Sequence, residues 1–281
     1  MATPRGRGRA FMELAAAGRN TFGAYAQVAA AVILVPSVAA VILAFTAGSG
    51  PVGRLIQQYA PIAVAGAVLI WSVQETHRRP WRTLISAGTG VDGRRIAIGA
   101  VVQLAIMGGQ LLLVDALAGW TLDLSLAVGW PVLLLALVLV PLQAGSEELL
   151  FRGYLTQALG RILRSRIVLA LLVGAAFGVL HFDTHGALTL PYFLLLSLLF
   201  SLVSLRDEGL ELTIGGHAAM NLFAFAAANS ALVAAAGAVG DTPAEMLQFN
   251  AAAILVLLVD GVLFYGLTRL LVRLFCRPRA L

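Results

Sequence analysis

The sequence predicts an all-α fold, a polytopic membrane helix bundle with about eight transmembrane helices. Apolar residues make up 60% of the 281 residues and charged residues only 12%, whereas soluble domains carry about 25% charged residues. The apolar residues form runs close to the roughly 20 residues that a bilayer crossing needs. All 19 basic residues are arginines, and they lie mainly between those runs. Disordered chains are poor in apolar residues, so the composition excludes a disordered chain. The single cysteine excludes a disulfide scaffold.

The spans follow from the apolar runs, taken in chain order. We predict membrane-spanning helices over residues 24–47, 59–73, 96–118, 126–145, 167–181, 187–205, 212–236 and 249–271. The first run is about twice as long as the 7–15-residue core of a signal peptide, so we interpret it as an uncleaved span. The amphipathic stretch before it predicts an interfacial N-terminal segment over residues 1–23. We find no internal repeat and no break in composition, which predicts a single transmembrane domain over residues 1–281.

The arginines predict the orientation of the chain. If the N-terminus is cytoplasmic and the chain crosses eight times, 18 of the 19 arginines lie on the cytoplasmic side and only Arg54 lies on the other. This asymmetry satisfies the positive-inside rule, so both termini are predicted to be cytoplasmic. A net charge of +5 could also indicate a nucleic-acid partner. However, the arginines are spread between the apolar runs, which indicates that they determine the membrane topology instead. The absence of lysine is typical of a GC-rich bacterial genome, and the predicted location is a bacterial inner membrane.

Ionisable residues inside the spans are the candidate functional residues, because each costs roughly 2.5–3.5 kcal/mol or more at the bilayer centre. They form three clusters, in which residues four apart share a helix face. The clusters are Glu147, Glu148 and Arg152, which close the fourth span, with Gln143 on the face of Glu147; Phe177 and His181, which end the fifth span; and His217 and Asn221, inside the seventh.

Each cluster alone has a structural interpretation that needs no chemistry. The first could be a solvated helix end, the second a histidine that reaches the interface, and the third a hydrogen-bonded pair that joins two helices. Together the clusters supply carboxylates, imidazoles, an amide and a guanidinium from three helices. That combination can activate water, transfer a proton and hold an oxyanion.

The three motifs, Glu-Glu-x-x-x-Arg, Phe-x-x-x-His and His-x-x-x-Asn in this order, resemble those of the CAAX-protease and bacteriocin-processing (CPBP) family of intramembrane proteases. The eukaryotic relatives in that family are the type II CAAX prenyl endopeptidases. The resemblance covers residues 140–221, the predicted catalytic core of the chain. The predicted number of helices also agrees with the family.

The resemblance implies a role for each motif residue. The implied catalytic residues are Glu147, Glu148, Arg152, His181, His217 and Asn221. Glu147 and His181 would polarise the attacking water, and His217 and Asn221 would hold the oxyanion. The second glutamate of the first motif would be oriented and kept ionised by the arginine.

The sequence leaves two interpretations of the cofactor. Glu147, His181 and His217 together form a plausible zinc-binding set of the kind found in His₂Glu catalytic sites. However, the His-Glu-x-x-His helix of the zincins is absent, and the CPBP family is also described as acting through a glutamate without metal. We therefore favour a mechanism without a metal cofactor, with zinc as the alternative.

The predicted function is that of an intramembrane endopeptidase that uses a glutamate- and histidine-activated water. Its predicted substrate is a membrane-associated peptide or protein, such as a leader peptide, in or at the lipid bilayer. One alternative is a transporter or channel with a proton relay, but we find no inverted repeats of the kind common in transporters. The other is a non-catalytic scaffold or immunity-type protein that keeps the family fold.

Three further residues and one conflict complete the expectations. Asp260, in the middle of the last span, could be a structural aspartate or part of the wall of the site. His185, four residues after His181, could be a further ligand, whereas Asp115 is predicted to be interfacial. The simple topology places Glu147 near the cytoplasmic end of its span. It places His181 about 14 residues, or ~21 Å, into the next span, although the clusters should meet.

Overall fold

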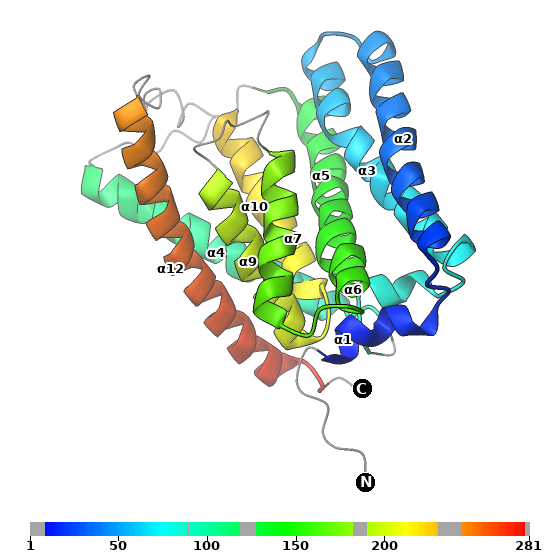
Figure 1. Cartoon of the computed structure of the whole chain (residues 1–281). Coiled ribbons are helices and arrows are strands. Elements are labelled where there is room, and N and C mark those ends of the chain that lie inside the picture. The colour runs from blue at the N-terminus through cyan, green and yellow to red at the C-terminus, as the bar shows by residue number, and fades with distance from the viewer. Residues whose placement is uncertain (1–8, 89, 119–127, 182–189, 230–242, 279–281) are drawn as a thin grey trace.

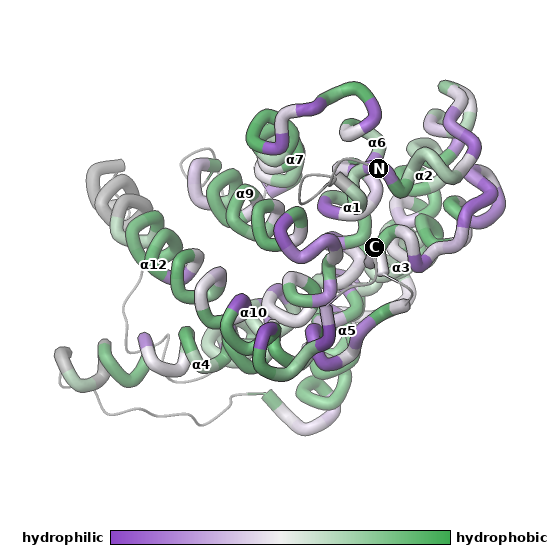
Figure 2. Tube along the Cα trace, turned by 90° about the horizontal axis from the view of Figure 1, so that it is seen from below, coloured by the Kyte–Doolittle hydropathy of each residue, from purple (hydrophilic) through white to green (hydrophobic). Residues whose placement is uncertain are grey.

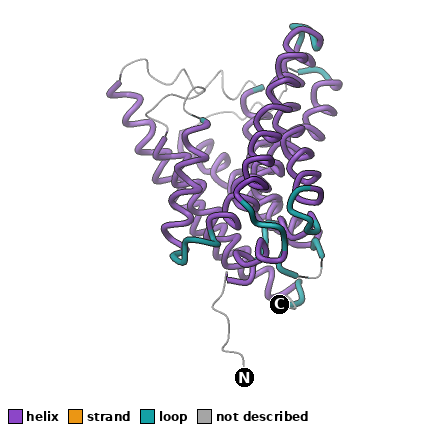
Figure 3. Tube along the Cα trace, turned by 45° about the vertical axis from the view of Figure 1, so that its right-hand side comes forward, coloured by secondary structure: helices purple, strands orange, loops and turns teal. Residues whose placement is uncertain are grey.

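The computed structural model of the chain describes residues 9–88, 90–118, 128–181, 190–229 and 243–278. In these ranges the regular elements are helices, and the β-type pairing is one isolated bridge between Ser86 and Gly209. Figure 1 shows most of the long helices side by side, with α4 (Gly93–Ala118) crossing behind them, and α1 (Arg9–Glu13) and the C-terminal end of α12 (Pro243–Phe275) at the same end of the bundle. In the turned view of Figure 3 the described loops gather at the ends of the bundle. The predicted all-α membrane bundle is therefore confirmed.

Each predicted run overlaps a helix, but some helices are longer than predicted: Pro51–Glu75 contains the run at 59–73, and Pro243–Phe275 contains the run at 249–271. In chain order the helices are α1 (Arg9–Glu13), η1 (Leu14–Ala17), α2 (Phe22–Thr46), α3 (Pro51–Glu75), η2 (Trp81–Leu84), α4 (Gly93–Ala118), α5 (Trp130–Glu147), η3 (Glu148–Leu155), α6 (Thr156–Leu159), α7 (Arg166–Leu180), α9 (Leu190–Asp207), α10 (Glu211–Ala228) and α12 (Pro243–Phe275). Six helices in the described part of the chain are long and apolar enough to cross a membrane, namely α2, α3, α4, the continuous helix Trp130–Leu159, α9 and α12. The apolar helix α7 has only 15 residues, and α10 contains polar residues. Eight crossings and the side of the termini stay predictions.

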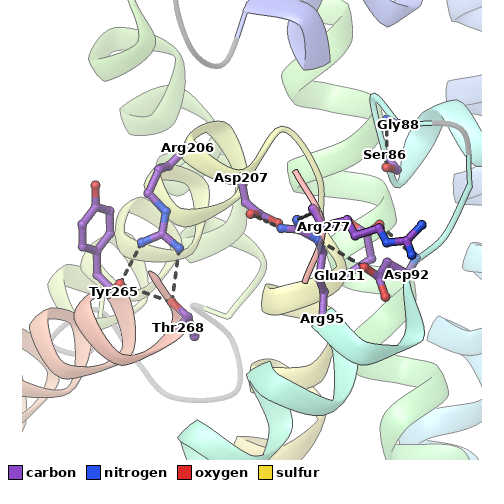
Figure 4. Close-up of polar contacts among 10 residues, drawn as sticks. All are labelled: Ser86, Gly88, Asp92, Arg95, Arg206, Asp207, Glu211, Tyr265, Thr268 and Arg277. Atoms are coloured by element: carbon purple, nitrogen blue, oxygen red, sulfur yellow. Dashed lines mark hydrogen bonds and ion pairs between the residues drawn. The ribbon is translucent and has the colours of Figure 1, made fainter. Parts of the chain in front are cut away.

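The surface and the interior have the polarity expected of a protein in lipid. Large apolar side chains such as Ile33 on α2 and Val262 on α12 are exposed on the outer faces of the helices, while Gln103, Glu148 and Thr213 are buried. Figure 2 shows hydrophobic residues along the helices and hydrophilic ones in the connecting segments at the end that faces the viewer. In a bilayer, polar groups must find their partners inside the protein, which explains why they are buried here. The ion pair of Arg95 on α4 with Asp207 at the end of α9 is one such contact between buried side chains (Figure 4).

The fourth predicted span differs from the structure in one important respect. We expected it to end at residue 145, with the glutamates closing it. Instead α5, η3 and α6 form one helix of 30 residues, Trp130–Leu159, so Glu147 and Glu148 lie near its middle. Arg152, which we assigned to the cytoplasmic side, is only 1% exposed. The helix continues because the charges after residue 146 are paired inside the protein rather than solvated.

This longer helix resolves the conflict in depth between the clusters. The chain turns after α6 and returns as α7, so His181, the residue that follows α7, ends a short helix that runs back along the bundle. The ring of Phe177 on α7 lies 5.2 Å from the ring of Phe151 on η3. The end of α7 therefore reaches the middle of the Trp130–Leu159 helix, where the glutamates are.

The described part of the N-terminal segment packs against the protein. Phe11 on α1 is fully buried, and its backbone N–H donates to the carboxylate of Glu208 over 2.7 Å. His77, after α3, contacts the carbonyl oxygen of Arg19 through Nδ1 at 2.6 Å and the hydroxyl of Tyr154 on η3 through Nε2 at 2.9 Å. Burial lowers the pKa of His77 below the ordinary histidine value, so its ring is neutral at pH 7. His77 thus connects η3 to the N-terminal segment, and in the predicted topology these contacts lie on the cytoplasmic side.

The predicted topology has a direct test. Reporter domains fused after Arg95 and after Arg279 should both read as cytoplasmic, and one fused after Gly240 should read as external, because arginines are retained on the cytoplasmic side. Residues 240 and 279 lie outside the described ranges, so this expectation rests on the sequence. A cytoplasmic reading at Gly240 would contradict the eight crossings.

Candidate active site

Glu148 joins the first and third motifs. Its side chain is fully buried at the start of η3. Its Oε1 atom lies 3.0 Å from Nη1 of Arg152, one turn further along, and 2.8 Å from Nδ1 of His217 on α10. Because a carboxylate only accepts hydrogen bonds, Nδ1 of His217 is the donor and carries a proton. The buried carboxylate thus fixes the orientation of the imidazole.

Glu147 approaches the same imidazole from the other side. Its Oε2 atom lies 3.5 Å from Nε2 of His217, and the residue is 7% exposed. Adjacent residues on a helix project about 100° apart, so Glu147 and Glu148 face different surroundings. His217 therefore lies between two carboxylates. Glu148 is fully buried, whereas Glu147 is slightly exposed.

Arg152 compensates this negative charge. The residue is 1% exposed, and its guanidinium carbon lies 4.4 Å from the centre of the Phe177 ring and 5.9 Å from that of Phe200. A cation over aromatic faces is stabilised without water, which suits a charge buried in the bundle. The ion pair with Glu148 and the two rings together hold Arg152 inside the protein.

The second motif reaches the site through aromatic contacts. The Phe177 ring lies 4.4 Å from the His181 ring and 6.3 Å from the His217 ring, so both imidazoles contact the same side chain. Nδ1 of His181 lies 2.8 Å from the carbonyl oxygen of Phe177, and the ring stacks on Phe193 at 4.4 Å. Because a carbonyl only accepts, Nδ1 of His181 carries the proton, and in this tautomer Nε2 is the acceptor nitrogen of the ring.

Asn221 contacts a residue that we did not include among the predicted catalytic residues. Its Nδ2 atom donates to Oε1 of Gln143 over 3.0 Å, and Gln143 lies one helical turn before Glu147 and is buried. The spacing of Gln143 and Glu147 was the signal that could have identified it. Phe200 on α9, whose ring lies 5.7 Å from that of His217, belongs to no motif. No pattern in the sequence indicated it.

The helix is locally widened where the motif begins. Residues 148–155 form a π-helix, in which hydrogen bonds run from residue i to i+5. Such segments are rare inside α-helices and are frequent at functional sites. Here the π-helix carries both Glu148 and Arg152, and it presents Tyr154 to His77. Nothing in the sequence predicted this change of helix type.

The described side chains do not fit the zinc-binding set that we considered. Among the described residues, no group of three or more histidine, cysteine, aspartate or glutamate side chains lies close enough together to hold a metal ion. His185, the candidate further ligand, lies outside the described residues, as does the side chain of Asp115.

Comparisons with known proteins agree with the motifs. Residues 128–223 match the family model described as type II CAAX prenyl endopeptidase Rce1-like, and this segment contains all three motifs. YyaK, an uncharacterized protein of Bacillus subtilis (strain 168), is 33% identical over 165 residues. That match covers 55% of this chain and 54% of YyaK, so the chain spans about half the length of the curated relative. No solved structure matches the chain. The resemblance inferred from the motifs is confirmed over this segment.

Proposed function

We propose that this chain, whose central segment is Rce1-like, is an intramembrane endopeptidase that hydrolyses a peptide bond in or at the membrane. The observation that carries the proposal is the position of His217 between Glu147 and Glu148, with Arg152 compensating the charge inside the bundle. A bundle that needed these groups only for stability would gain little from two carboxylates on one buried imidazole. The substrate is a membrane-associated or leader peptide, and the location is a bacterial inner membrane.

The hydrolysis begins with a water molecule near Glu147. Glu147 takes a proton from this water as the water oxygen attacks the carbonyl carbon of the peptide, and His181 orients the water through Nε2. The proton then passes from Glu147 to the nitrogen of the leaving amine as the tetrahedral intermediate collapses. Glu147 suits this role better than Glu148, which already contacts Arg152 and His217.

The oxyanion of the intermediate is held by His217 and Asn221. Glu148 stabilises a positive charge on His217, so that Nε2 of His217 can donate to the oxyanion in place of Glu147. Asn221 has a second N–H besides the one that it donates to Gln143. Gln143 orients the amide of Asn221, and Arg152 keeps Glu148 ionised. Each of the six predicted catalytic residues then has one defined task.

We expect Asn221→Ala to lower the cleavage rate by about 10²–10³-fold with little change in substrate binding, because one oxyanion donor is lost. Gln143→Ala should lower the rate less, since it only frees the Asn221 amide to rotate. Initial rates over a range of peptide concentrations would separate kcat from KM. If Gln143→Ala still lowered the rate in an Asn221→Ala background, Gln143 would not act through Asn221.

The metal-free mechanism makes its own prediction. Cleavage should persist after dialysis against a chelator, because Oε2 of Glu147 contacts Nε2 of His217 directly and the described residues contain no group of three side chains that could hold a metal ion. Elemental analysis of the purified protein should find far less than one zinc per chain. Stoichiometric zinc that is lost together with activity in a His217→Ala protein would contradict the metal-free mechanism and make Glu147, His181 and His217 its ligands.

The proposed function can be tested without knowledge of the natural substrate. The purified protein in detergent would be incubated with a library of apolar peptides, and products would be identified by mass spectrometry. Cleavage that disappears in the Glu147→Gln protein would support the proposal. A folded protein that cleaves none of the peptides would instead favour the non-catalytic scaffold.

A further inference from the structure

A second feature of the bundle is a cavity of about 50 Å³ among α4, α9, α10 and α12. Most of its walls are apolar, and three polar side chains, Gln103, Tyr192 and Asp260, also line it. The apolar lining includes Met107, Leu196, Leu199, Met220, Leu257 and Phe264. The volume accommodates about three or four water-sized groups, which is the size of a valine or leucine side chain. The hydrolysis described above uses none of these residues.

Asp260 is the unusual residue of this cavity. It lies inside α12, a helix that can cross the membrane, and it is half-buried. Among the described residues its hydrogen-bond partner is the side-chain amide of Gln110 on α4, which donates to Oδ1. A carboxyl group has two oxygens with several acceptor positions. Asp260 can therefore accept a further hydrogen bond from a group in the cavity.

The cavity adjoins the candidate active site. Phe200 is in its wall, and the ring of Phe200 lies 5.7 Å from the ring of His217 and 5.8 Å from that of Phe264. Met220, also in the wall, directly precedes Asn221 on α10. When a peptide binds with its scissile bond at His217 and Asn221, the ring of Phe200 lies between that bond and the apolar cavity.

We propose that this cavity is a subsite that binds an unwound apolar segment of the substrate and that Asp260 accepts a hydrogen bond from a backbone N–H of that segment. A helical peptide bond is inaccessible to attack, so the substrate must unwind near the scissile bond. Unwinding frees backbone N–H groups, and in a bilayer they find no water to bond. A carboxylate acceptor in a mostly apolar cavity meets that need. This inference rests on the proposed function for the nature of its occupant.

The glycines of α12 allow the cavity to be filled with a matched control. Gly261 lines the cavity, and a Cβ atom placed there would lie 2.5 Å from Cδ1 of Leu199, another lining residue. Gly266 on the same helix has no atom within 4 Å of such a position. Gly261→Val should therefore occupy the subsite, whereas Gly266→Val makes the same chemical change on the lipid side. For a peptide that the wild type cleaves, Gly261→Val should raise KM about tenfold with kcat almost unchanged, and Gly266→Val should alter neither.

Asp260 variants test the hydrogen bond itself. Asp260→Leu removes the acceptor and should raise KM about tenfold, while Asp260→Asn keeps a carbonyl acceptor and should stay within about threefold of the wild type. Peptides methylated at one backbone nitrogen at a time extend the test. One position should weaken cleavage by the wild type about tenfold and have no further effect on Asp260→Leu. If every methylated peptide affects the two proteins equally, the proposed hydrogen bond is absent.

A binding measurement separates this inference from the proposed function. Glu147→Gln protein would be mixed with the same apolar peptide library, and the retained peptides would be identified by mass spectrometry after gel filtration. The inference expects retained peptides that are lost when Gly261→Val or Asp260→Leu is added, but not Gly266→Val. Such retention without any wild-type cleavage would refute the protease and leave the subsite standing. Cleavage by the wild type with retention unaffected by both variants, or no retention at all, would overturn the subsite.

Discussion

Replacing Glu147 by glutamine is expected to lower the rate of peptide cleavage by about 10²–10⁴-fold, the range typical of a lost general base. Glutamine has the same size and can still contact Nε2 of His217, which lies 3.5 Å from Oε2 of Glu147. It cannot take a proton from water, so only the chemical step should suffer. Initial rates with a peptide that the wild type cleaves would measure the loss.

Two controls give this prediction its meaning. Glu75→Gln changes a glutamate whose side chain is 52% exposed and paired with the exposed Arg78, and it should leave cleavage unchanged. The thermal unfolding of the Glu147→Gln protein in detergent should match that of the wild type, because an isosteric side chain leaves the packing intact. A wild-type cleavage rate in the folded Glu147→Gln protein would show that another group is the base.

The second large effect is expected in stability. Arg152→Met should lower the free energy of unfolding by about 3–5 kcal/mol, because it leaves the buried carboxylate of Glu148 without its cation. Both side chains are fully enclosed, with 3.0 Å between Nη1 and Oε1. Equilibrium unfolding in mixed micelles would measure the change. Arg78→Met, which breaks an exposed pair with Glu75, should cost no more than about 1 kcal/mol.

A double variant distinguishes lost charge from lost packing. Glu148→Gln together with Arg152→Met removes both charges and should recover most of the stability that Arg152→Met loses. It should not recover cleavage, since His217 would lack the carboxylate that orients it at 2.8 Å. A double variant as unstable as Arg152→Met would mean that the contacts of the arginine with Phe177 and Phe200 matter more than its charge.

Several properties of this protein could be predicted from the sequence because they depend on local composition. The length of an apolar run determines whether a helix can cross a bilayer, and each predicted span overlaps a helix of the structure. Motif spacing also identified residues that meet, since residues four apart share a helix face whatever packs against it. Glu148 with Arg152 and Phe177 with His181 are contacts of that kind.

Other properties were decided only by contacts between helices that are far apart in the sequence. From the sequence we predicted that the fourth span ends before Glu147, because charged residues usually mark the edge of a membrane. In the folded protein His217, 69 residues away from Glu148, pairs with that carboxylate, and Phe177 and Phe200 enclose Arg152. The helix can then continue through η3 inside the bundle. Two further hydrogen bonds join residues that are far apart in the sequence, one between Asn221 and Gln143 and one between Gln110 and Asp260. The cavity that Asp260 lines is likewise formed by several helices. A sequence pattern shows that a buried polar group needs a partner, whereas the partner's identity depends on which helices pack together.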